Sequence, residues 1–81
     1  MEVLAQKVLG MFGYLNKDVL DLHELFEAGG NDPDARSVVV DTVERLVKEG
    51  LFEERGNDFY ALTAKGKESA QLIVSFQSMP A

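Results

Sequence analysis

The stretch LVKEGLFEERGNDFYALTAKGKE, residues 46–68, constrains the fold more than any other part of the chain. Gly50 suits a helix end, because glycine adopts positive φ without strain. The segments LFEER and DFYAL after it read as two strands. Thr63 then suits the N-cap of another helix. This order predicts a helix end, a hairpin over residues 51–62 and a helix over residues 64–77.

The hairpin is expected to turn at Gly56-Asn57. Both residue types tolerate positive φ, which a two-residue hairpin turn requires. Arg55 and Asp58 flank this turn. Their opposite charges lead us to expect an ion pair across the turn, with Arg55 as the basic residue at the hairpin tip.

Capping residues and apolar periodicity divide the earlier part of the chain. Asp21 and Glu24 form a capping box, and Gly29 is expected to end that helix in the left-handed conformation. Asp32 and Pro33 suit the N-cap and first position of the next helix. The expected elements are a helix over residues 2–15, a short strand over 18–21, a helix over 22–28 and a helix over 33–49.

The third of these helices carries the clearest apolar stripe. We expect its buried residues to be Val39, Val43, Leu46 and Val47. A chain of 81 residues has room for one modest core, so we expect one domain over residues 1–81. The predicted class is mainly α with a small β-hairpin.

The element order is that of the winged helix-turn-helix fold. The segments VERLVKEGLFEE and FYALTAKGKE resemble the LxxxGLI and YxLTxKG signatures of bacterial winged-helix regulators of the MarR and PadR kind. The matching residues are Leu46, Gly50, Leu51, Tyr60, Leu62, Thr63, Lys65 and Gly66. The resemblance implies a three-helix core, a two-stranded wing and a C-terminal helix. It also implies that the third helix enters a DNA major groove while the wing touches the backbone or the minor groove.

This resemblance makes a DNA-binding transcriptional regulator the leading hypothesis. The candidate DNA-binding residues are Arg36, Ser37, Asp41, Arg45, Lys48, Arg55 and Asn57. The charge opposes this reading, because the chain has a net charge of −6 and residues 33–63 hold seven acids against four bases. The alternative is a protein-interaction module whose acidic face binds a basic protein partner.

The first and last helices suggest a homodimer. Apolar residues crowd the last helix, and two glycines in the first helix would admit a close neighbour. The candidate dimer interface comprises Gly10, Gly13, Leu72, Ile73 and Phe76. The alternative is that these residues only cover the core of their own chain.

Catalytic and metal-binding motifs are not expected. His23 and Glu27 have i, i+4 spacing, but two ligands do not make a metal site. The sequence has no Gly-rich phosphate loop or nucleophile elbow, so we expect neither an enzyme nor a bound cofactor. The chain has no cysteine and no apolar run that would span a membrane, and cytoplasmic residence is the expectation.

Overall fold

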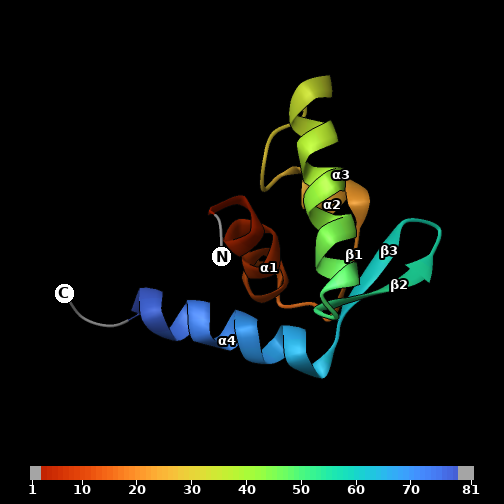
Figure 1. Cartoon of the computed structure of the whole chain (residues 1–81). Coiled ribbons are helices and arrows are strands. Elements are labelled where there is room, and N and C mark those ends of the chain that lie inside the picture. Colours follow the sequence, from red (N-terminus) through yellow and green to blue (C-terminus); the bar gives the residue numbers. More distant parts are fainter. Residues whose placement is uncertain (1–2, 79–81) are drawn as a thin grey trace.

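The computed structural model describes the backbone of residues 3–78 and the side chains of residues 3–71. It is mainly helical, with a small antiparallel sheet. The elements are α1 (Val3–Leu15), β1 (Val19–Asp21), α2 (Leu22–Phe26), α3 (Pro33–Lys48), β2 (Phe52–Gly56), β3 (Phe59–Leu62) and α4 (Ala64–Ser78). Each lies within two residues of its predicted range, although residue 2, the predicted start of the first helix, is outside the described residues. In Figure 1 the β2–β3 hairpin projects to one side and α4 runs past α1.

The predicted helix caps are present. The Asp21 carboxylate accepts the Glu24 amide at 2.8 Å, and the Glu24 carboxylate accepts the Asp21 amide at 3.2 Å. The Asp32 carboxylate accepts the Ala35 amide at 3.0 Å, with Pro33 at the first position of α3. These bonds satisfy amides that a helix start leaves without intrahelical acceptors.

The glycine expected to end α2 is displaced by one residue. Gly30, not Gly29, has positive φ, at 114°, and α2 ends earlier than predicted, at Phe26. Gly29 serves a different purpose, because a Cβ there would lie 2.6 Å from Val39 Cγ2 and 3.2 Å from Leu4 Cδ1. Any larger residue at this position would have to displace the side chains of Val39 on α3 and Leu4 on α1.

The core forms where α1, α3 and the sheet meet. The predicted stripe of α3 buries Val39, Val43 and Leu46 and leaves Val47 partly buried. Thr42, which the apolar pattern did not select, is also buried, and its hydroxyl donates to the Val38 carbonyl at 2.9 Å. That bond satisfies the hydroxyl within its own helix, so α3 can bury it.

The sheet has three strands rather than the two of the predicted wing. The strand order is β1-β3-β2, with both neighbouring pairs antiparallel. Leu20 lies opposite Tyr60 in the β1–β3 pair, and Leu20 is fully buried. The short β1 strand therefore fastens the base of the hairpin to the core.

The hairpin turn lies one residue later than predicted. Asn57 and Asp58 both have positive φ, at 52° and 64°, so they are the two central turn residues. Gly56 pairs with Phe59 at the end of the ladder, and Arg55 is the extra residue of a β-bulge. Sequence reasoning missed this bulge because one inserted residue leaves the local pattern almost unchanged.

A junction of four residues joins the end of α3 to the start of α4. The Thr63 hydroxyl donates to the Gly50 carbonyl at 2.6 Å and accepts the Gly66 amide at 3.0 Å. The Thr63 amide donates to the Leu51 carbonyl at 3.1 Å. Gly66 is buried against Leu51, and a Cβ at Gly66 would overlap the Leu51 carbonyl oxygen. We call Gly50, Leu51, Thr63 and Gly66 the Thr63 junction.

Two helical glycines provide a matched test of this packing. We expect Gly66→Ala to lower the free energy of unfolding by about 1–3 kcal/mol, because the new methyl group displaces the Leu51 backbone. We expect Gly10→Ala to raise it by up to about 1 kcal/mol, because no neighbouring group lies within 4 Å of the new methyl and alanine favours the helix. Urea denaturation at low protein concentration measures both changes, and equal effects of the two variants would contradict this packing.

Candidate functional site

The outer side of α3 holds most of the candidate contact residues. Arg36, Ser37, Asp41, Arg45 and Lys48 are all exposed. They run from the first turn of α3 to its last residue, so the structure spreads them along the helix. In Figure 1 the β2–β3 hairpin, which carries Arg55 and Asn57, lies beside the C-terminal half of α3. The seven candidates therefore line one helix and the neighbouring hairpin.

Acidic neighbours accompany two of the candidate arginines. Arg45 Nε lies 3.8 Å from a Glu49 carboxylate oxygen, one helical turn away. Arg55 Nε lies 3.5 Å from Glu53 Oε1, so its partner is Glu53 and not the expected Asp58. Because Arg55 is the extra residue of the bulge, it has no directly opposite residue on β3. Both pairs are exposed and contribute little to stability, but they reduce the positive charge offered to a phosphate.

Arg36 has a different neighbour. Its guanidinium carbon lies 5.1 Å from the centre of the Phe26 ring, within the range of a cation–π contact. The contact joins the start of α3 to the end of α2. Arg36 therefore has a packing role in addition to its exposed charge.

The charges of three carboxylates act on Tyr60, and one of them, Glu54, lies directly opposite it in the β2–β3 pair. Burial raises the pKa of Tyr60, and the nearby charges of Glu54, Asp58 and Glu44 raise the same pKa further. Glu44 comes from α3, Glu54 from β2 and Asp58 from the hairpin turn. We call these four residues the Tyr60 cluster. The cluster brings negative charge to the junction of α3 and the hairpin, where the winged-helix resemblance implies contact with DNA.

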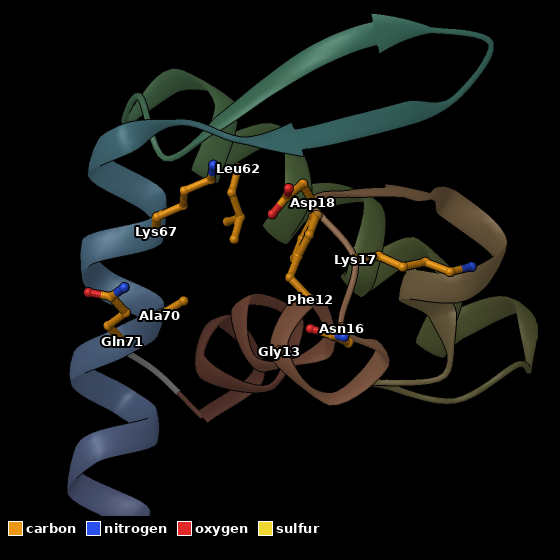
Figure 2. Close-up of a pocket in the computed structure, with 9 residues that line it drawn as sticks. All are labelled: Phe12, Gly13, Asn16, Lys17, Asp18, Leu62, Lys67, Ala70 and Gln71. Carbon is orange, nitrogen blue, oxygen red and sulfur yellow. The ribbon is translucent and has the colours of Figure 1, made fainter.

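A groove of about 520 Å³ lies between α1, the end of β3 and α4 (Figure 2). Phe12, Leu62 and Ala70 supply its apolar surface. The Lys17 side chain points away from Lys67 in Figure 2, and its Nζ is 3.1 Å from Glu24 Oε2. The polar groups around the groove do not converge on one point, as a ligand site requires.

Gly10 and Gly13, the two candidate dimer residues on α1, lie in different environments. Gly13 lines the groove of Figure 2, where α1 approaches α4. Apart from its chain neighbours and the backbone of its own helix, a Cβ added at Gly10 would meet no atom of the described residues within 4 Å. The place of Gly10 in a dimer interface stays a prediction, because the structure describes a single chain. The other candidates, Leu72, Ile73 and Phe76, lie outside the described side chains.

The single histidine of the chain makes an aromatic contact. The His23 ring lies edge-on to Phe26, with 6.0 Å between ring centres. Within residues 3–71, no three His, Cys, Asp or Glu side chains gather as metal ligands would. Among the helices that the structure describes, none combines the length and apolar character needed to cross a membrane.

The Tyr60 cluster gives a testable titration. Tyr60 is expected to ionise above the ordinary tyrosine pKa of about 10. Its raised folded-state pKa contributes stability that is complete below that ordinary value and is lost as the pH rises through the folded pKa. Glu54→Gln should lower the Tyr60 pKa, whereas Glu68→Gln on α4 should leave it unchanged. Absorbance at 295 nm, with Tyr60→Phe subtracted, follows the titration, and no difference between the two variants would contradict the cluster.

Comparisons with protein-family models, curated proteins and solved structures gave no match. The winged-helix resemblance therefore rests on the sequence motifs at residues 43–54 and 59–68, and not on a match to a known protein. Several of those residues have defined structural tasks, since Gly50 has positive φ and Thr63 and Gly66 join α4 to the end of α3. The assignment of function accordingly starts from the geometry and charge of α3 and the hairpin.

Proposed function

We propose that the chain is a winged-helix protein-interaction module whose α3–hairpin face binds a basic segment of a partner protein. The observation that carries this proposal is the Tyr60 cluster. Its carboxylates come from three elements and act on one half-buried aromatic side chain. A surface of this kind attracts lysine or arginine side chains and repels a polyanion.

The chemistry of the Tyr60 cluster suits a cationic side chain. The Tyr60 ring supports a cation–π contact, which is worth about 0.5–1 kcal/mol at an exposed site and more when water is excluded. Charge-assisted hydrogen bonds from an arginine to Glu44 or Glu54 would add to that contact. Asp41, which is also exposed on α3, extends the acidic surface along the helix. A basic segment lying along α3 would therefore meet carboxylates at successive positions.

Sequence-independent DNA affinity comes chiefly from lysine and arginine contacts to phosphates. On α3 and the hairpin, Arg45 and Arg55 each lie beside a glutamate. A duplex seated there would also place its phosphates near the Tyr60 cluster. Electrostatics on this face consequently favour a basic protein over DNA.

DNA binding remains the second candidate function. The observation that favours it is that α3 and the β2–β3 hairpin lie side by side (Figure 1), as the resemblance to winged-helix regulators implies for a DNA reader. In that case Arg45, Lys48 and Arg55 would contact phosphates. Asp41 and Glu44 would oppose them, although a carboxylate can accept a hydrogen bond from cytosine N4.

Replacing acids of the cluster separates the two functions. The double variant Glu44→Gln/Glu54→Gln should weaken binding of a fluorescent lysine- and arginine-rich peptide by about tenfold or more, because each lost charge pair costs affinity. A control variant, Asp18→Asn/Glu68→Gln, removes the same net charge elsewhere and should change affinity by less than about twofold. Fluorescence anisotropy at low salt measures both.

A fluorescent DNA duplex under the same conditions provides the opposing outcome. Tight duplex binding by the wild-type protein, strengthened in Glu44→Gln/Glu54→Gln and weakened in Lys48→Ala/Arg55→Ala, would overturn the protein-docking proposal in favour of DNA binding. Equal loss of peptide binding in the cluster and control variants would also contradict it, because the attraction would then come from net charge alone.

A further inference from the structure

The outer side of α1 exposes apolar side chains that its own chain leaves uncovered. The exposed fraction is 67% for Val3 and 82% for Tyr14. Gly10 lies between them on the same side, since positions 3, 10 and 14 recur at helical spacing. Beyond its chain neighbours and its own helix backbone, no atom of residues 3–71 lies within 4 Å of where a Gly10 side chain would begin, so Gly10 leaves an open site beside an exposed aromatic residue.

This side of α1 is one wall of a groove of about 500 Å³. The other wall comes from Glu27 and Ala28, which follow α2. Met11 is partly buried and also lines the groove, so the apolar surface continues from the core to the outside. The groove lies apart from the Tyr60 cluster, and none of the cluster residues lines it.

The charges of the groove are self-complementary. Lys7 is the one charged residue of α1 in the range Val3–Leu15, and it lines the groove together with Glu27. A two-fold interface brings the same patch of each subunit together, so it is favoured where one patch carries both signs of charge. Two copies that meet through other parts of the surface repel each other, because the chain has a net charge of −6.

We propose that the occupant of this groove is a second copy of the chain. The two α1 helices pack across a two-fold axis, with the partner's Tyr14 seated at Gly10. Lys7 of each subunit then faces the partner's Glu27. This assignment follows from the exposed Val3 and Tyr14, the open Gly10 and the opposite charges in one groove. It does not depend on the proposed docking function, because the two surfaces share no residue.

Sedimentation velocity of the full chain over a range of about 1 to 500 µM tests the proposal. The wild-type protein should form a dimer within this range. Gly10→Arg should raise the dissociation constant by at least about tenfold, since its side chain fills the site of the partner's Tyr14. The variant is expected to fold, because the new side chain meets no neighbouring group of its own chain near its base. Circular dichroism at low concentration checks the fold.

A charge exchange makes the test specific. Lys7→Glu alone should weaken the dimer, because it places two carboxylates opposite each other, and Lys7→Glu/Glu27→Lys should restore it. A wild-type protein that stays monomeric at about 500 µM would overturn the proposal. A dimer that tolerates Gly10→Arg but dissociates in Ile73→Glu would overturn it as well, because the interface would then lie on α4.

Discussion

The hydrogen bonds of Thr63 hold together α3, the hairpin and α4, the elements on which the proposed function depends. One side chain donates to the Gly50 carbonyl, where α3 has just ended, and accepts the Gly66 amide in the first turn of α4. The Thr63 amide bonds to the Leu51 carbonyl, at the entrance to β2. Lys65 adds a bond from its Nζ to the Glu49 carbonyl at 3.0 Å, which suits a cation at a helix C-terminus. The end of α3, the base of the hairpin and the start of α4 are thus fixed at one point.

This junction accounts for the position of the Tyr60 cluster. Glu44 is on α3, whereas Glu54 and Asp58 are on the hairpin, and the three act together only if the hairpin is held at a set angle to the helix. The pairing of β1 with β3 supports the same angle from the other edge, because Leu20 lies fully buried opposite Tyr60. A rigid frame therefore carries an exposed acidic surface. The proposed recognition of a basic partner depends on that rigidity, because preorganised charges lose less entropy on binding.

Local signals in the sequence predicted much of the fold. The capping box at Asp21, the Asp32 cap and the positive φ of Gly50 are each decided by a few adjacent residues, and all three are present. Contacts between distant residues were not predictable in this way. The addition of β1 to the sheet and the close passage of Gly29 by Val39 both require knowledge of the packed arrangement.

In the candidate site, too, features set by a single helix were predictable, whereas contacts between different elements were not. Helical periodicity predicted the buried stripe of α3, and the candidates Asp41, Arg45 and Lys48 lie outside that stripe and are exposed, because exposure follows from the phase of one helix. The gathering of carboxylates at Tyr60 was missed, since it combines residues from three elements. Similarly, the shift of the turn to Asn57-Asp58 changed the partner of Arg55 from the expected Asp58 to Glu53.

Native-state amide hydrogen exchange tests the role of the Thr63 junction most directly. If the junction holds α3, the hairpin and α4 as one unit, the Thr63 and Gly66 amides should exchange with about the same opening free energy as the Val43 amide in the core of α3. Both should lose that protection in Thr63→Val, which removes the hydroxyl and keeps the shape of the side chain. Fast exchange of the two amides in the wild-type protein, while Val43 stays protected, would contradict the account.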